Sequence, residues 1–382
     1  MLNKLQKAFS IVFPGKRTVI RQEPAGKARG CAVISYITWP FVEGFDSPKM
    51  RGHTNAYEVT AMAEAYRDLG FRVEIIDCGD MTYVAPADCR VAIDIHGNLE
   101  RWQGALPAGC KRILHATGPH WLFFNHAELS RLQSVQTRKG VALKPRRQVE
   151  PSSGLEVADE VVVLGNDFTR QSFLFGGKPV TRVPISSAYE FAWPGNRDFE
   201  TARKKFLWVG SYGMVHKGLD LALDAFAGTP DLELTVCGRP EKEEDFYRLY
   251  ERQLLKTPNI RLHGWLDMAT PDFAEIVRTH AAVIYPSSAE GGAGSVIHCM
   301  HAGMLPVCTT EASIDLGDFG VHVASGTVEA VQAACRAVAE MPASEVESRA
   351  RAAYEHVRRV HTRGKFRENY RKFAERITEG IF

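Results

Sequence analysis

One turn of the sequence combines a carboxylate with three glycines in four positions. It spans residues 285–295 as YPSSAEGGAGS, after an apolar strand and before a helix with an apolar face. Glycines let a backbone approach a ligand closely, and a helix N-terminus offers unpaired N–H groups and a positive dipole end to an anion. Glu290 can therefore hold sugar hydroxyls while amides of this turn hold phosphate oxygens. The alternative is a glycine turn with a solvated glutamate.

A second turn, GSYGMVHKGLD (210–220), places a lysine close to the start of the next helix. A cation at that end opposes the helix dipole, and a bound diphosphate would reverse this mismatch at Lys217. Gly210 and Gly213 again allow the backbone to approach a ligand closely. We predict that Lys217 binds phosphate, and the alternative is an exposed surface lysine.

Short β-branched segments alternate with amphipathic helices along the chain, which predicts parallel sheets with crossover helices. A stretch rich in Pro, Gly and Ser at 184–198 divides the chain, and the alternation then restarts. The sequence thus predicts an α/β protein with two doubly wound, Rossmann-like domains that face each other across a cleft, with the ligand site at the carboxyl ends of the strands. Strands are expected at 31–37, 71–77, 91–97, 111–117, 158–165, 206–211, 232–238, 260–265, 281–287 and 305–309, and helices at 54–69, 217–227, 241–255, 295–302 and 343–378.

The two turns and their helices resemble the retaining group 1 glycosyltransferases of the GT-B fold. The resemblance covers most of residues 200–340, in the segments FLWVGSYGMVHKGLDLALDAF and EGGAGSVIHCMHAGMLPV. The segments AYEVTAMAEAYRDLGFRVEII and ADEVVVLGNDFTRQSF resemble the N-terminal half of the family more loosely. The resemblance implies an acceptor-binding domain over 1–190, a nucleotide-sugar-binding domain over 191–355, and a helix over 356–382 that crosses back to the first domain.

The resemblance also implies an activity. A sugar would move, with retention at its anomeric carbon, from a UDP-, GDP- or other nucleoside diphosphate sugar to a hydroxyl of a glycan, a lipid-linked molecule or a small molecule. Lys217 would contact the donor phosphates and Glu290 the donor sugar, as catalytic residues. The amides of the glycine turn would contact phosphate or sugar, namely those of Gly291, Gly292, Ala293, Gly294 and Ser295. Neither a metal nor a cofactor is implied, and the sequence has no Asp-x-Asp at a strand end. The lysine and the helix dipoles would hold the phosphate charge instead.

Two positions depart from the family pattern. Ser211 and Tyr212 stand where the family usually has an arginine soon after the first glycine, and we expect Arg239 to supply that guanidinium. His298 replaces the last glutamate of the Glu-x7-Glu motif, which in the family accepts hydrogen bonds from ribose hydroxyls; a neutral imidazole accepts one such bond but not two. These departures leave open a catalytically degenerate protein that binds or scaffolds sugar nucleotides. Another GT-B chemistry, such as that of an epimerase or phosphorylase, is a third hypothesis.

Other candidate site residues lie before and after the two turns. Gly52, just before the first long helix, would let the backbone approach the donor diphosphate. His120, in TGPHW, is favoured over His96 as a catalytic histidine facing the cleft, and either is equally consistent with a structural histidine. His263, in LHGW, is expected to contact the nucleotide base.

The charge balance argues against nucleic acid as a partner, since 47 Lys and Arg against 45 Asp and Glu give a net charge of +2. The basic segment 137–148 fits a surface for lipid head groups, a site for an anionic acceptor, or a solvated loop. Residues 2–17 fit a membrane-surface helix, a helix packed on the body, or a frayed end. No apolar stretch approaches the length of a membrane span, and the eight cysteines form no C-x-x-C pair. We expect a cytoplasmic protein, with peripheral contact at the inner membrane face left open.

Overall fold

Two sheets organise the part of the chain that the computed structural model describes, residues 18–43, 47, 50 and 52–381. The first sheet has seven strands in the order β1-β3-β2-β4-β5-β6-β7, and only β1 pairs antiparallel. All five strands predicted for this half are present, and the two edge strands were not predicted. The strands are β1 (Ile20–Gln22), β2 (Cys31–Tyr36), β3 (Arg72–Asp77), β4 (Cys89–Asp94), β5 (Lys111–Ala116), β6 (Glu160–Val163) and β7 (Val180–Arg182).

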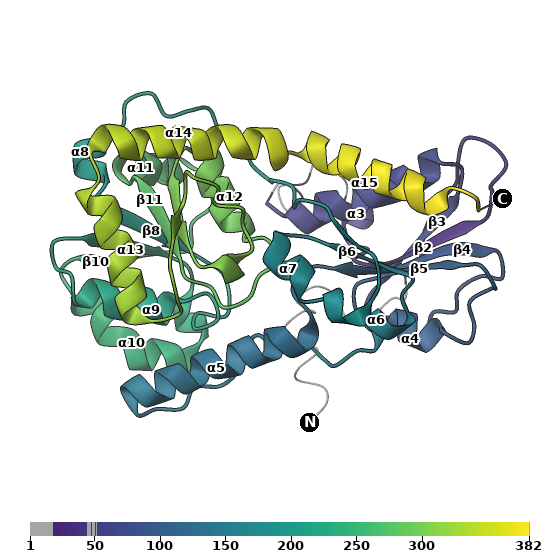
Figure 1. Cartoon of the computed structure of the whole chain (residues 1–382), viewed down its shortest axis with the longest axis horizontal. Helices are drawn as coiled ribbons and strands as arrows, with labels where there is room; N and C mark the ends of the chain where they lie inside the picture. Colours follow the sequence, from purple (N-terminus) through teal and green to yellow (C-terminus); the bar gives the residue numbers. More distant parts are fainter. Residues whose placement is uncertain (1–17, 44–46, 48–49, 51, 382) are drawn as a thin grey trace.

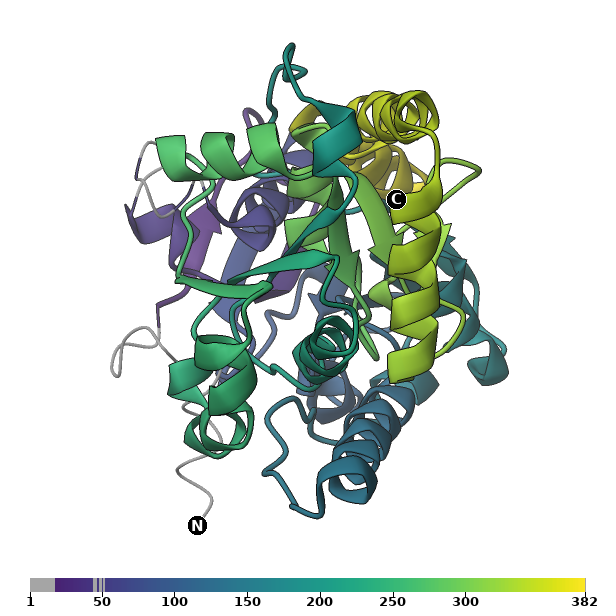
Figure 2. The same ribbon diagram turned by 90° about the vertical axis from the view of Figure 1, so that its left-hand side faces the viewer.

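The second sheet is wholly parallel, with six strands in the order β10-β9-β8-β11-β12-β13. Seen from its end of the molecule, this sheet has helices on both sides (Figure 2). The predicted class, two doubly wound α/β domains, is therefore confirmed. The strands are β8 (Lys205–Val209), β9 (Glu233–Cys237), β10 (Ile260–Gly264), β11 (Ala282–Tyr285), β12 (Leu305–Cys308) and β13 (Val321–His322).

The helices follow the strands in both lobes, with three differences from the predicted bounds. The helix expected at 241–255 begins at Glu244, because residues 240–242 form a separate 3-10 turn. The helix expected at 217–227 begins at Leu219, because Gly218 caps it with a left-handed φ of 73°. The helix expected at 343–378 is two helices, because the Thr362 side chain caps a new one by accepting a hydrogen bond from the Lys365 N–H. The helices other than α5 are α1 (Pro40–Glu43), α3 (Thr54–Asp68), α4 (Asn98–Trp102), α6 (Gly154–Val157), α7 (Asp167–Gln171), α8 (Phe199–Ala202), α9 (Leu219–Ala227), α10 (Glu244–Lys256), α11 (Pro271–Thr279), α12 (Gly294–His301), α13 (Val328–Glu340), α14 (Ala343–Val360) and α15 (Arg363–Thr378).

Each lobe sends one helix to the other. Helix α5 (Trp121–Lys139) runs along one side of the molecule, and its Leu132 and Val135 lie in the core cluster of the second sheet (Figure 1). Along the other side α14 continues into α15, which packs against α3 of the first lobe (Figure 1). The two lobes are therefore joined by packed helices as well as by the linker.

The basic segment 137–148 lies against the second lobe. Arg138 forms ion pairs with Asp220 and Asp224 of α9, and Lys139 lies 2.6 Å from Asp224. Arg146 pairs with Asp245 of α10. The solvated-loop alternative is wrong for these three cations, because acidic side chains of the second lobe neutralise them. The helix suggested for residues 2–17 lies outside the described residues. Among the helices that are described, none combines the length and apolarity needed to cross a membrane.

We predict that the free energy of unfolding falls in mild acid, because four histidines are buried uncharged. Burial lowers the pKa of His115, His280 and His361 to about 4 and that of His298 to about 3. The unfolded chain binds protons near its usual pKa, about 6.5, so stability present above that pH is lost as the pH falls toward 4. Between pH 7 and pH 5 each histidine contributes a loss of at most about 2 kcal/mol.

Urea denaturation across this pH range measures the effect, and His115→Phe is the informative variant. Neither ring nitrogen of His115 has a hydrogen-bond partner within the described chain, so phenylalanine removes the titration without breaking a bond. The variant should lose less stability between pH 7 and pH 5 than the wild type. If the variant and the wild type lose the same stability between pH 7 and pH 5, His115 is not buried uncharged in the folded protein.

Candidate active site at the interface of the two lobes

The turn after β8 places Lys217 at the edge of the second sheet where the strands end. The Lys217 carbonyl accepts a hydrogen bond from Trp208 Nε1 at 3.1 Å, and the Lys217 N–H donates one to the Gly213 carbonyl at 2.9 Å. Gly210 leaves room for the Trp208 ring and the lysine stem, since a Cβ there would lie 2.6 Å from the ring and 3.1 Å from Lys217 Cδ. Only 8% of Lys217 is exposed. The exposed-lysine alternative is therefore wrong.

Glu290 meets Lys217 at the end of β11. Lys217 Nζ lies 2.6 Å from Glu290 Oε1, and the same oxygen accepts hydrogen bonds from the Tyr285 hydroxyl at 3.2 Å and the Ser287 hydroxyl at 3.3 Å. Glu290 Oε2 makes no hydrogen bond to any residue the structure describes. With Oε1 fixed and Oε2 open, the carboxylate is held in one orientation and can accept a hydrogen bond from a substrate hydroxyl.

The charges around Glu290 keep it ionised. Burial alone would raise its pKa, but the positive charges of Lys217, Arg147 and His216 hold that pKa at about 2. Burial lowers the pKa of Lys217, and the Glu290 charge opposes this shift. Glu290 is 9% exposed, so the solvated-glutamate alternative is wrong as well. The predicted proximity of an ammonium and a carboxylate on two separate turns is thus found.

The glycine turn after Glu290 packs against the first lobe. A Cβ on Gly291 would lie 2.0 Å from the Thr117 carbonyl oxygen, and one on Gly292 would lie 2.8 Å from the Ile185 side chain. Thr169 also donates a hydrogen bond to the Glu290 carbonyl at 3.3 Å. These glycines therefore allow the two lobes to touch at the site, a role that the sequence prediction did not include.

The predicted row of phosphate-binding amides is shorter than expected. The Ala293 N–H donates to the Ala312 carbonyl at 3.1 Å, so this amide is not available to an anion. Helix α12 begins at Gly294, and the N–H groups of Gly294 and Ser295 make no hydrogen bond within the described residues, as is usual in a first helical turn. The N–H groups of Gly291 and Gly292 also make no hydrogen bond within the described residues, so of the five predicted amides only that of Ala293 is already occupied.

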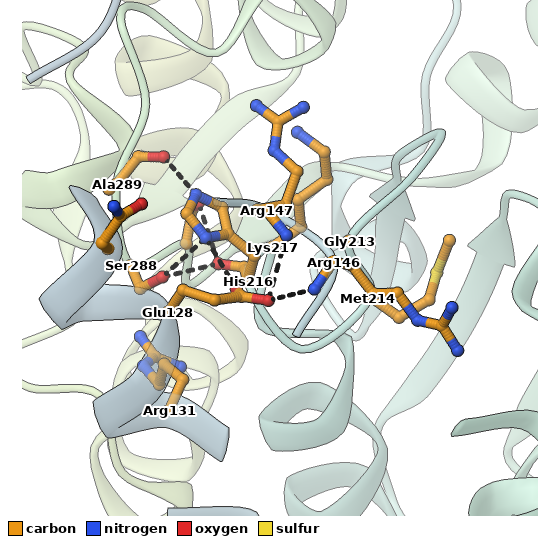
Figure 3. A network of polar contacts seen from close by, with 12 residues as sticks. Glu128, Arg131, Arg146, Arg147, Gly213, Met214, His216, Lys217, Ser288 and Ala289 are labelled. Carbon is orange, nitrogen blue, oxygen red and sulfur yellow. Dashed lines mark hydrogen bonds and ion pairs between the residues drawn. The ribbon is translucent and has the colours of Figure 1, made fainter. Parts of the chain in front are cut away.

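A buried polar network that sequence reasoning missed connects helix α5 to both turns (Figure 3). His216 Nδ1 lies 3.0 Å from Glu128 Oε2, and His216 Nε2 lies 2.5 Å from the Ala289 carbonyl oxygen. Both ring nitrogens thus face acceptors, a geometry that an imidazolium satisfies and a neutral ring does not. Burial opposes ionisation of Glu128, but its hydrogen bond to His216 and the nearby charges lower its pKa overall. The sequence signal for His216 was its place directly before Lys217; Glu128 had none.

His298 does not present its acceptor nitrogen to a ribose. Its Nε2 accepts a hydrogen bond from the Ala188 N–H at 3.0 Å, and burial keeps the ring neutral. The proton of the neutral ring is therefore on Nδ1, which can donate but not accept. The linker between the lobes thus occupies the one nitrogen of His298 that could accept a hydrogen bond from a ribose hydroxyl. A contact of His298 with the donor stays a prediction, with Nδ1–H as the hydrogen-bond donor.

His120 acts as the N-cap of α5. Its Nδ1 accepts a hydrogen bond from the Leu122 N–H at 3.4 Å, and its ring packs against Phe173 and Phe175. The Nε2 atom is buried without a partner in the described part of the chain. This placement accounts for the residue type structurally, and a catalytic role for His120 stays a prediction.

The remaining predicted residues lie around this centre or away from it. Gly52 is exposed, and a Cβ there would lie 3.4 Å from the Tyr189 hydroxyl. Ser211 is also exposed and follows β8. Arg239 lies over the Trp265 ring, with its guanidinium carbon 4.5 Å from the ring centroid. His263 lies near the end of β10, and its Nδ1 is buried without a partner among the residues described. Their contacts with a nucleotide stay predictions.

The comparisons with known proteins agree with this architecture. Residues 203–341 match the family described as "Glycosyl transferases group 1". No curated protein matches the sequence. Among solved structures, HepE of Anabaena in complex with UDP and glucose has 11% identity and a TM-score of 0.57, over 91% of this chain and 99% of that chain. WaaG, a glycosyltransferase involved in lipopolysaccharide biosynthesis, has 14% identity and a TM-score of 0.52, over 92% and 100%.

A TarM mutant of S. aureus, in complex with Fondaparinux, alpha-GlcNAc-glycerol and UDP, has 12% identity and a TM-score of 0.51 over 74% of this chain. The chain spans only 55% of that protein. At such identities these structures show the fold, and the family match identifies the second lobe. The second lobe thus matches the group 1 glycosyltransferase family over residues 203–341, and the two facing sheets are those of the GT-B fold.

Proposed function

We propose that the chain is a retaining, metal-independent glycosyltransferase that transfers a sugar from a nucleoside diphosphate sugar to a hydroxyl acceptor. The observation that carries the proposal is the buried pair formed by Lys217 and Glu290, with Nζ and Oε1 2.6 Å apart, at the contact between the two lobes. The ammonium group supplies a fixed positive charge for the leaving diphosphate. Glu290 Oε2 supplies an acceptor for a hydroxyl of the donor sugar.

The chemistry follows from where charge develops. As the anomeric carbon–oxygen bond breaks, negative charge grows on the diphosphate and positive charge on the sugar ring. Lys217 and the first N–H groups of α12 stabilise the negative charge on the diphosphate, and the Glu290 carboxylate stabilises the positive charge on the sugar ring. The acceptor hydroxyl attacks the face that the diphosphate leaves, and its proton passes to the departing phosphate oxygen. No metal enters this scheme, because side chains and amides neutralise the diphosphate.

A panel of nucleotides tests the donor assignment. We expect thermal unfolding to shift upward with one of UDP, GDP or ADP, because a ligand that binds only the folded state stabilises it by about 2.7 kcal/mol at one hundred times its Kd. UDP is the first to test, since HepE and TarM were solved with it. The corresponding nucleotide sugar should then be turned over equally well with and without EDTA, and the product should keep the anomeric configuration of the donor. No shift with any nucleotide would contradict the proposal.

A catalytically degenerate sugar-nucleotide binding protein is the second candidate, and one observation favours it. The His298 nitrogen that would accept a ribose hydroxyl is occupied by the Ala188 N–H. A degenerate protein would bind the nucleotide sugar and show neither hydrolysis nor transfer. Slow hydrolysis of the donor without any acceptor would favour the enzyme.

A further inference from the structure

Arg147 lies at the edge of this site and pairs with no carboxylate among the described residues. It follows α5, in the first half of the sequence, yet it contacts the turn that carries Lys217. Its guanidinium carbon lies 5.6 Å from the centroid of the Phe124 ring. The Nε atom is buried without a partner, and the guanidinium forms no hydrogen bond or ion pair with a described residue. A half-buried arginine with unused donors indicates a place for an anion.

The backbone of Arg147 is fixed by the same network that holds His216. Glu128 Oε1 accepts hydrogen bonds from the N–H groups of Arg146 and Arg147 at 2.7 and 3.1 Å, and its other oxygen contacts His216. Arg146 itself is turned the other way, onto Asp245. The Arg147 side chain then passes over Gly213, where a Cβ would lie 2.5 Å from Arg147 Cγ. Glycine at that position is therefore required for this path.

The path brings Arg147 to Lys217. Their side chains extend in the same direction away from Glu128 (Figure 3). The charge of Arg147 also lowers the pKa of both Lys217 and Glu290, which places the guanidinium within electrostatic reach of the pair. Lys217 shares its charge with Glu290, and Arg147 adds a second positive charge that no described carboxylate pairs with.

We propose that Arg147 binds the diphosphate of the sugar nucleotide beside Lys217, so that a residue from the first half of the chain completes the donor site of the second lobe. This inference rests on the proposed function. A guanidinium offers two parallel N–H donors to a phosphate, which an ammonium does not. The family pattern has a phosphate-binding arginine after Gly210 that this chain lacks. In this proposal Arg147 supplies that guanidinium from the first half of the chain, and Arg239, which lies over Trp265, is not needed for it.

The test compares three arginine-to-methionine variants by isothermal titration calorimetry with UDP, GDP or ADP, whichever binds the wild-type chain best, and with the matching nucleoside. Methionine keeps the apolar packing of the stem. For Arg147→Met we expect diphosphate binding to weaken roughly 10- to 100-fold, with nucleoside binding unchanged, because charge-assisted bonds to phosphate are lost. Arg146→Met is the matched control, since its guanidinium is bound to Asp245, and we expect its Kd for the diphosphate to stay within about threefold of the wild type.

The third variant, Arg239→Met, separates this proposal from the sequence-based expectation. If Arg239→Met weakens diphosphate binding and Arg147→Met does not, the proposal is wrong and Arg239 holds the phosphate. If Lys217→Met weakens binding while neither arginine variant does, the proposed function stands and Arg147 has no part in it. If the wild-type chain binds none of the three nucleotides, the proposed function fails and this inference fails with it. Thermal unfolding of each variant shows whether a loss of binding is merely a loss of fold.

Discussion

Replacing Lys217 with methionine is expected to reduce turnover of the nucleotide sugar by about three orders of magnitude, because a charge aimed at the leaving group is worth roughly 100- to 1,000-fold or more in rate. Methionine matches the length of the lysine stem. The variant would also leave Glu290 buried beside Tyr285 and Ser287 without its cation, which costs about 3–5 kcal/mol of stability. Loss of rate and loss of stability must therefore be measured separately.

The double variant Lys217→Met with Glu290→Gln makes that separation. It removes both charges of a pair that is about nine-tenths buried on each side, and replacing a buried pair as a whole is often nearly neutral for stability. We expect its urea midpoint to return toward the wild-type value, while turnover stays as low as in the single variant. Turnover of either variant within threefold of the wild type would contradict the catalytic assignment of the pair.

Replacing Gly291 with alanine is expected to push the two lobes apart at the site. The new methyl group would lie 2.0 Å from the Thr117 carbonyl oxygen, and backbone atoms cannot rotate away as a side chain can. The lobes must then separate, and a displacement of about 1 Å at a reacting centre can cost roughly 100-fold in rate. Small-angle scattering should show a larger radius of gyration, and turnover should fall.

Gly195→Ala is the control for this substitution. It lies in the exposed linker before α8, and a Cβ there meets nothing within 4 Å. We expect the wild-type radius and turnover for the control, and a wild-type circular dichroism spectrum for both variants. If Gly291→Ala keeps the wild-type radius, the contact between the glycine turn and the first lobe does not hold the lobes together.

The sequence was sufficient for the pair at the centre of the site because each partner lies in a local pattern. Lys217 and Glu290 each follow a strand and precede a helix, and parallel strands bring all such turns to one edge of a sheet. The two doubly wound sheets follow from the same alternation. The short edge strands β1 and β7 were missed because only three residues form each of them.

The rest of the site depends on contacts between distant residues. Glu128 and His216 are separated by 88 positions, and His298 and Ala188 by 110. No pattern of hydrophobic spacing indicates that α5 continues past its own sheet and packs on the second one. The basic segment 137–148 was visible in the sequence. Its neutralisation by α9 and α10 was not, because that depends on how one lobe is placed on the other.

The exchange of α5 and α15 between the lobes has a consequence for dissecting the protein. A chain cut in the linker around residue 195 would yield two fragments, each lacking a helix that its own sheet needs for cover and each carrying an uncovered helix of the other. Separately produced fragments would therefore expose apolar surface and depend on mutual complementation, so neither is a self-sufficient unit for isolated study.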